Sequence, residues 1–221
     1  AMTVRITNIG CSITSIHTSD RNGIQQNIVA GFDSPMEYVR NPWYFGCIVG
    51  RVVNRIGSAI FHLDGHAVRL STNDGDNHLH GGFEGFHKKI WDVKSVIHHA
   101  TEAGVGFEYT SPDGEEGYPG RLQVQVKYIL NVENKLSLSY TATTDKRTPV
   151  NLANHSYFNL SGFCSQQITD HELMVHAKDY TEKYMQNLPT GRILSLTGTP
   201  LDLSRSVRIG DRIDQLSADR G

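Results

Sequence analysis

Uncharged polar side chains interrupt an otherwise apolar stretch, PVNLANHSYFNLSG, which runs from Pro149 to Gly162. Successive side chains of a β-strand point to opposite faces. A strand over this stretch would place five residues on one face: Asn151, Ala153, His155, Tyr157 and Asn159. Its other face would hold Val150, Leu152, Phe158 and Leu160 together with Asn154 and Ser156. Amides, an imidazole and a phenol suit a ligand that carries several hydroxyls, although a solvated sheet face is the other interpretation.

A second candidate is His80, which precedes Gly81 and Gly82 in the segment NDGDNHLHGGFEGF. Glycine lets the backbone turn sharply and leaves room for a ligand beside the neighbouring imidazole. A histidine before two glycines is also a common turn residue, so this signal is weak when taken alone.

The third candidate pair is Asn54 and Arg55, within GRVVNRIG. The planar guanidinium of an arginine can hold two oxygens of a ligand, or it can pair with a surface carboxylate.

The spacing of His78, His80 and Glu84 also permits a metal site. It follows the H-x-H-x₃-E pattern of cupin-like metalloenzymes, in which residues two apart on a strand share a face. The glycines and proline that flank the pattern in cupins do not line up with this sequence. Stoichiometric zinc, iron or manganese in the purified protein would favour the metalloenzyme interpretation.

Two neighbouring segments give the clearest secondary-structure signal. RLQVQVKYIL, from Arg121, and NKLSLSYTAT, from Asn134, place a hydrophobic side chain at every second position. Period two is typical of strands with one buried face. We expect an antiparallel hairpin joined through residues 131–134.

Several short strands and few helices are expected elsewhere. The strands are predicted at Thr3–Ile9, Ala67–Leu70, Asp92–Ile97, Gly106–Thr110 and Glu172–His176, and short helical pieces near Ser34–Val39 and Gly210–Leu216. Many short strands without an internal repeat or linker predict one all-β sandwich domain over residues 1–221.

Composition limits the possible partners. A net charge of −2 without a basic run argues against nucleic acid. No apolar run approaches the ~20 residues of a membrane-spanning helix, and the N-terminus carries no secretion signal. Cys11, Cys47 and Cys164 are odd in number and widely spaced, which is typical of free thiols. We expect a cytoplasmic protein without a membrane partner.

Taken together, the segments resemble the aldose 1-epimerase family, also called galactose mutarotases. The similarity is carried, in family order, by GRVVNRIG, LDGHAVRL, NHLHGGFEGFHKKIWDV, SPDGEEGYPG, TPVNLANHSYFNLSG and LPTGRI followed by GTPLDL. It extends to about Leu203 and implies an antiparallel β-supersandwich of the galactose mutarotase type.

The resemblance implies interconversion of the α and β anomers of a free aldose, such as D-galactose or D-glucose, without a cofactor or a metal. An acid and a base open and close the sugar ring, and each contributes typically ~10²–10⁴-fold when positioned. By matching position, His155 is the general acid at the ring oxygen, and His80 hydrogen-bonds the sugar nearby. Asn54 and Arg55 bind hydroxyls, and Tyr157 lines the pocket.

The chain departs from the family pattern near its last residues, LSADRG. The family's general-base Glu and a sugar-binding Asp follow the GTPLDL block beyond this point. The resemblance therefore implies a sandwich that lacks its C-terminal strands, with the base supplied by the remaining C-terminal part of the same protein. Glu115 and Glu116 are expected to be solvated turn carboxylates. A non-catalytic carbohydrate-binding module, which needs no base, is the other interpretation.

Overall fold

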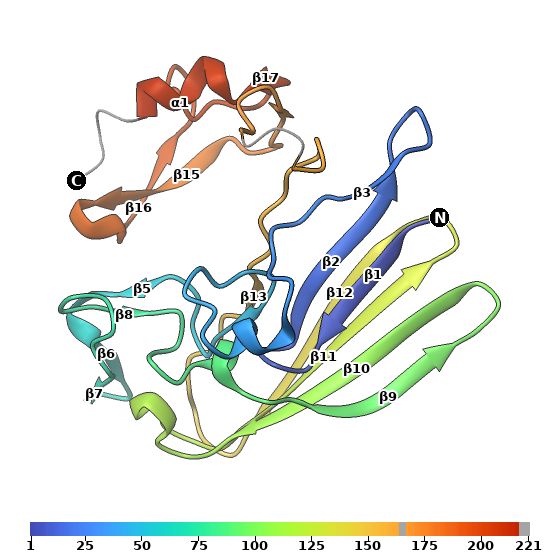
Figure 1. The fold of residues 1–221 in the computed structure, drawn as a ribbon. Coiled ribbons are helices and arrows are strands. Elements are labelled where there is room, and N and C mark those ends of the chain that lie inside the picture. Colours follow the sequence, from blue (N-terminus) through green and yellow to red (C-terminus); the bar gives the residue numbers. More distant parts are fainter. Residues whose placement is uncertain (164–166, 217–221) are drawn as a thin grey trace. The chain divides into compact units, whose positions relative to one another are not determined.

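Short antiparallel strands make up most of the regular structure. The computed structural model describes residues 1–163 and 167–216, and the chain divides into two compact units, Ala1–Phe158 and Asn159–Gly221 (Figure 1). The all-β prediction is confirmed. The single domain over residues 1–221 stays a prediction.

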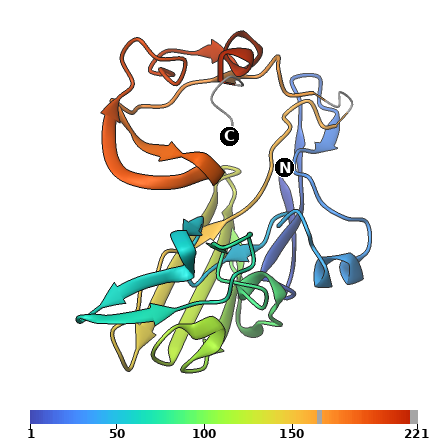
Figure 2. The same cartoon turned by 90° about the vertical axis from the view of Figure 1, so that its left-hand side faces the viewer.

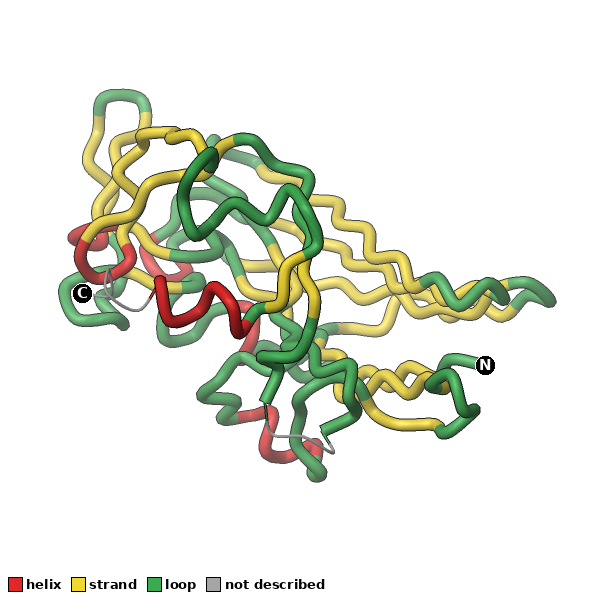
Figure 3. The backbone as a smooth tube through the Cα atoms, turned by 90° about the horizontal axis from the view of Figure 1, so that it is seen from above, coloured by secondary structure: helices red, strands yellow, loops and turns green. Residues whose placement is uncertain are grey.

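Two antiparallel sheets form the frame of the first unit. One has three strands in the order β1 (Thr3–Thr7), β2 (Ser12–Ser19) and β3 (Gln25–Asn27). The other has four strands in the order β12 (Leu136–Thr144), β11 (Leu122–Asn131), β10 (Glu102–Ser111) and β9 (Asp92–His98). Seen from above, the long strands of this unit run beside one another (Figure 3).

The predicted β11–β12 hairpin supplies much of the core. Its strands pair antiparallel along β11, and the alternating face of β11 is at most 1% exposed at Leu122, Val124, Val126 and Tyr128. These side chains cluster with Ile13 and Ile16 of β2, so both sheets share one core. Full burial of a large apolar side chain stabilises the fold by about 1.5–3 kcal/mol. The alternation of apolar and polar residues along β11 therefore decides which face of this strand packs in the core.

Short two-stranded pairings order the loops of this unit. They are β4 (Ile48–Val49) with β13 (Ala153–Asn154), β5 (Arg55–Ile56) with β8 (His78–Leu79), and β6 (Ile60–Leu63) with β7 (His66–Arg69). Single 3₁₀ turns lie at η1 (Pro35–Val39), η2 (Gly57–Ala59), η3 (Phe86–Lys88) and η4 (Glu115–Gly117). In Figure 2 the cyan β6–β7 hairpin extends to the left, away from the long strands.

The second unit is smaller and contains two further strand pairs. β14 (Glu172–Leu173) pairs with β17 (Val207–Arg208), and β15 (Asp179–Tyr184) pairs with β16 (Leu188–Ser195) through η5 (Met185–Asn187). The helix α1 spans Gly210–Leu216, as predicted, whereas the strand predicted at Glu172–His176 is shorter. Among the described residues, no helix has the length and apolar character needed to cross a membrane.

The stretch Pro149–Gly162 does not form the expected continuous strand. Only Ala153–Asn154 is a strand, and Asn151 and Phe158 make isolated bridges to Val52 and Val29. The expected alternation of faces is wrong at several positions: Val150, Phe158 and Leu160 are 40%, 53% and 66% exposed, and Asn159 is buried. After Asn154 the backbone leaves the sheet, so the period of two no longer applies.

Candidate active site

His80 and His155 come from distant parts of the chain and meet in the first unit. Their ring centroids lie 5.2 Å apart, with the rings nearly perpendicular at 84°. The Tyr157 ring lies 5.0 Å from that of His155. Both imidazoles are half-buried, and no described group hydrogen-bonds the His155 ring nitrogens. The structure therefore brings three of the candidate side chains into one cluster.

The stretch from Gly46 to Arg55 holds both histidines in place. On one side, the His155 N–H donates to Cys47 O at 2.8 Å, and the Gly46 N–H donates to His155 O at 3.1 Å. On the other side, β5 pairs with β8, and the His80 N–H donates to Asn54 O at 3.1 Å. Because one stretch pairs with both segments, the separation of the imidazoles is set by main-chain hydrogen bonds.

Asn54 also fixes the tautomer of His80. The Asn54 N–H donates to His80 Nδ1 at 3.0 Å, so Nδ1 must carry a lone pair and the proton of the neutral ring is on Nε2. Burial, with the nearby His155 and Arg55, lowers the pKa of His80 to about 4. At neutral pH, His80 is therefore an uncharged ring whose Nε2–H has no described protein partner.

The two glycines after His80 let other chain segments pack closely against the backbone of this loop. A Cβ on Gly81 would lie 1.6 Å from Gly50 O, and one on Gly82 would lie 2.1 Å from the Glu116 carboxylate. Their φ angles are +89° and +99°. The expectation that they leave room for a ligand is wrong at these two Cβ positions, because the protein itself fills that space.

Three non-glycine residues of the cluster have left-handed backbone conformations. The φ angles are +58° at Tyr44, +63° at Asn54 and +53° at His80. Such conformations cost on the order of 1–3 kcal/mol each and persist where the surroundings hold them. At Asn54 and His80 the hydrogen bonds between the two residues provide that constraint, which keeps the imidazole pre-oriented. Tyr44 is held by the turn in which its N–H donates to Asn41 O at 3.1 Å.

Arg55 extends the polar side of the cluster. Its Nε donates to Asp74 Oδ2 at 2.7 Å, and Nη1 donates to Asn54 Oδ1 at 3.4 Å. Among the described residues, no group accepts from Nη2, so part of the guanidinium fork is free for a ligand oxygen. The Asn54 side chain is exposed, which leaves its amide accessible.

Arg51, which the sequence did not single out, anchors the central stretch. It is 2% exposed, and its guanidinium donates to Ser111 Oγ, Ser111 O, Pro112 O and Pro119 O at 2.8–3.3 Å. The Asn151 N–H donates to Arg51 O at 2.9 Å. Arg51 thus links the Gly46–Arg55 stretch, which pairs with both histidine segments, to the end of β10.

Glu115 and Glu116 are not solvated turn carboxylates, so that expectation is wrong. Glu115 accepts from Tyr109 Oη at 2.6 Å and pairs with Lys89 Nζ at 2.9 Å, with its side chain 12% exposed. Glu116 accepts from the Glu84 N–H at 2.6 Å and from Ser71 Oγ. Turn propensity could not reveal these partners, because they come from other segments. Glu116 thereby holds the loop that follows His80.

His78 is a packing residue, which argues against the cupin-like alternative. It is fully buried; Nδ1 lies 2.7 Å from Ser71 O and Nε2 lies 2.8 Å from Tyr118 Oη. A carbonyl only accepts, so Nδ1 donates and Nε2 accepts from Tyr118. Both nitrogens are occupied. Within residues 1–163 and 167–216, no group of three or more His, Cys, Asp or Glu side chains could hold a metal.

Cys11 and Cys47 are buried and unbridged, as expected, and burial raises the pKa of Cys11 to about 12. A thiol that stays protonated is a poor nucleophile and a poor metal ligand. Cys164 lies outside the described residues.

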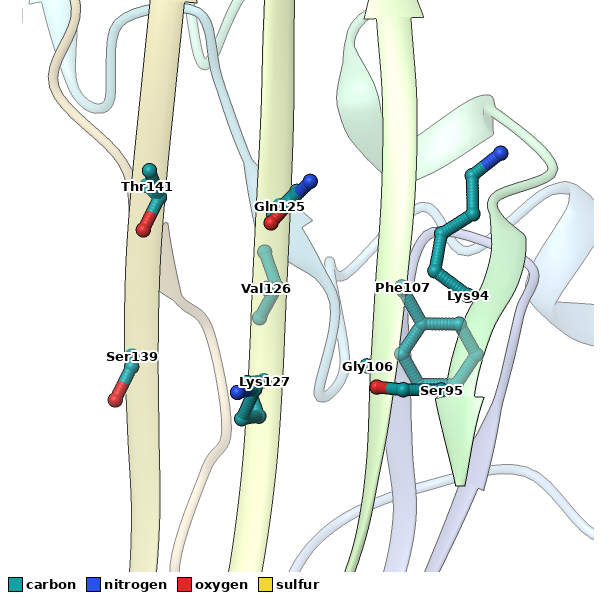
Figure 4. A pocket seen from close by; sticks show the side chains of 9 residues that line it. All are labelled: Lys94, Ser95, Gly106, Phe107, Gln125, Val126, Lys127, Ser139 and Thr141. Carbon is teal, nitrogen blue, oxygen red and sulfur yellow. The ribbon is translucent and has the colours of Figure 1, made fainter. Parts of the chain in front are cut away.

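The four-stranded sheet carries a depression that shares no lining residue with the imidazole cluster. It encloses about 170 Å³ between β9 and β12, and hydroxyls, an amide and two amines border it (Figure 4). At Gly106, next to a register shift between β9 and β10, the Ser95 hydroxyl fills the space that a side chain would take, since a Cβ there would lie 2.4 Å from Ser95 Oγ.

Nearly the whole chain matches known proteins. A family model described as aldose 1-epimerase matches residues 1–220. The chain belongs to the aldose 1-epimerase family. A galactose mutarotase from Bos taurus is 43% identical over 212 residues, which are 96% of this chain and 60% of that protein. An aldose 1-epimerase from Escherichia coli is 35% identical, over 94% of this chain and 58% of that protein.

Solved structures of the family share the fold. An aldose epimerase homologue from C. elegans superposes with a TM-score of 0.88 at 32% identity, over 96% of this chain and 63% of that chain. The predicted galactose mutarotase-like architecture is confirmed. The chain spans about 60% of the length of the curated relatives it matches.

Proposed function

We propose that the imidazole cluster binds a free aldose and interconverts its anomers. The observation that carries the proposal is the 5.2 Å separation of the His80 and His155 rings, since two proton-handling groups meet beside accessible hydrogen-bonding side chains. The relatives named galactose mutarotase and aldose 1-epimerase support this reaction class.

His155 is the general acid in this proposal. Its imidazolium gives a proton to the ring oxygen as the bond between that oxygen and C1 breaks, and it recovers the proton when the ring closes. The lack of described protein partners on both ring nitrogens supports this role, because the acid must be free to meet the sugar. An imidazole suits the task, because it can both donate a proton and take it back.

His80 stabilises the oxygen that receives the proton. Its neutral ring presents Nε2–H, which can donate a hydrogen bond without competing for the proton that His155 delivers. A preorganised donor of this kind contributes typically ~10²–10³-fold. Asn54, Arg55 and Tyr157 hold further hydroxyls of the sugar.

The base remains a prediction of the resemblance, a Glu from the C-terminal part of the protein. The carboxylate described in the cluster, Asp74, forms an ion pair with Arg55 at 2.7 Å. Glu115 and Glu116 already accept several hydrogen bonds. We assign no base among the described residues.

Polarimetry on freshly dissolved α-D-galactose tests the proposal. Because the base is predicted in the C-terminal part of the protein, the assay uses the protein together with that part. We expect it to speed the approach to anomeric equilibrium and His155→Ala to lower that rate by about 10²–10⁴-fold, with the thermal midpoint nearly unchanged. His66→Ala, at an exposed position of β7, is the matched control. Binding of the sugar without a faster approach to equilibrium would contradict catalysis, and activity of His155→Ala within a few-fold would contradict the acid assignment.

A further inference from the structure

Tyr44 lies at the centre of the cluster, although its sequence context did not mark it. Its ring centroid is 4.8 Å from that of His80, 4.7 Å from that of His87 and 5.7 Å from that of His155. The planes of Tyr44 and His155 are inclined by only 34°, so these two rings are partly stacked. A single phenol ring therefore contacts both proposed proton-handling residues.

The backbone holds Tyr44 firmly in this position. Its φ of +58° lies in the left-handed region, within a turn closed by Asn41. The Asn41 amide accepts from the Phe45 N–H at 2.8 Å and donates to Phe45 O at 3.0 Å. Gly46, which follows Phe45, donates its N–H to His155 O at 3.1 Å. The ring is thus placed by the same stretch that places the acid.

The hydroxyl of Tyr44 has no hydrogen-bond partner among the described residues, although the side chain is half-buried. Arg55, Asp74 and Tyr157 are near enough to act on it electrostatically. Burial raises the pKa of Tyr44, so the phenol is protonated at neutral pH and can both donate and accept. A polar group in this setting gains a bond when a ligand supplies the partner.

We propose that Tyr44 is a further substrate-contacting residue, whose phenol hydroxyl hydrogen-bonds a hydroxyl of the sugar held between His80 and His155. The inference rests on the proposed function for its pocket and its ligand class. It adds a contact that would help decide which aldose fits, because a hydroxyl partner is sensitive to the orientation of each sugar hydroxyl.

The test is a titration with D-galactose, followed by NMR of the histidine ring protons, for the wild type and Tyr44→Phe. Phenylalanine keeps the ring contacts and removes only the oxygen. We expect the Kd to rise about 3- to 10-fold with an unchanged thermal midpoint. The control is Tyr38→Phe, whose hydroxyl accepts from the Phe32 N–H at 3.2 Å, and it should leave the Kd unchanged. Equal affinity of Tyr44→Phe and the wild type overturns the proposal, as does a wild type that binds no sugar.

A set of deoxy-D-galactoses guards against an indirect effect of the substitution on the fold. If the contact is direct, the analogue that lacks the contacted hydroxyl loses affinity for the wild type but not for Tyr44→Phe. Equal losses for both proteins, with every analogue, overturn the proposal. Polarimetry on the same samples keeps the two claims apart: a wild type that binds galactose but does not speed mutarotation refutes the proposed function and leaves the Tyr44 contact standing.

Discussion

His78 and His80 lie two residues apart, yet they occupy two different chemical regions. Around His78, Ser71 and Tyr118 satisfy both ring nitrogens and the side chain is fully buried. Around His80, a backbone N–H occupies Nδ1, while Nε2 has no described protein partner. The left-handed φ of +53° at His80 ends the strand alternation, so the two rings do not share the face that a metal site would need.

The difference teaches that the partners of an imidazole, more than its neighbours in sequence, decide what it can do. A ring with both nitrogens satisfied contributes to stability, because removing it leaves buried groups unpaired. A ring with one nitrogen fixed and the other free has a defined tautomer and an available donor. Substitutions at the two positions should therefore separate stability from activity.

Among the substitutions that compare the two regions, the largest effect is expected for His80→Asn. Asparagine tolerates the left-handed backbone, so the fold should survive, but the Nε2–H donor and the ring contact with Tyr44 are lost. We expect the mutarotation rate to fall about 10²–10³-fold, with the free energy of unfolding changed by less than about 1 kcal/mol. Polarimetry and urea unfolding measure the two quantities. A rate within a few-fold of the wild type would remove His80 from the proposed mechanism.

His78→Phe should lower the stability of the fold and leave sugar binding nearly unchanged. The substitution leaves the Tyr118 hydroxyl and the Ser71 carbonyl without their partner in a buried site, which costs about 1–3 kcal/mol. We expect a lower urea midpoint, with sugar affinity near that of the wild type in the remaining folded protein. A large loss of activity at unchanged stability would mean that the two regions are not separate in function.

Glu116→Gln probes the link between the two regions, because Glu116 contacts Ser71 on one side and the loop after His80 on the other. The neutral amide cannot accept as strongly from the Glu84 N–H, so we expect a loss of about 1–2 kcal/mol in the free energy of unfolding. The rate should fall less than with His80→Asn. Glu102→Gln, at the start of β10, is a matched control. An unchanged free energy of unfolding would show that the carboxylate does not hold this loop.

Acid stability depends on a third histidine, His87, whose ring packs against Tyr44. Burial lowers the pKa of His87 to about 3, whereas the unfolded chain takes up this proton near the ordinary value of ~6.5. His87 therefore stabilises the fold fully above pH ~6.5, and this contribution falls as the pH drops towards 3, by about 1.4 kcal/mol per pH unit. His87→Phe should flatten the decline of the unfolding free energy between pH 6 and 4. Parallel curves for the variant and the wild type would contradict this assignment.

The sequence predicted much of the frame, because local patterns are enough for it. The period of two in β11 and β12 follows directly from burial of one strand face. The helix over Gly210–Leu216 was also predicted. The same reasoning failed at Pro149–Gly162, since there the backbone pairs with the Gly46–Cys47 turn instead of continuing in a sheet.

The residue types of the candidate site could be read from the sequence, but their arrangement could not. Spacing singled out His80, His155, Asn54 and Arg55, and it also gave His78 and Glu84 a metal-site interpretation. It did not mark Tyr44 or Arg51, because an aromatic beside Trp43 and an arginine beside valines look like ordinary packing residues.

The chain by itself determined which side chains were available for proton transfer and which strands would form the core. Tertiary structure alone decided that one main-chain stretch, Gly46–Arg55, would pair with both histidine segments and so set the distance between their rings. It also decided which ring nitrogen of His80 holds the proton. Both outcomes depend on hydrogen bonds between residues far apart along the chain, which no local periodicity can encode.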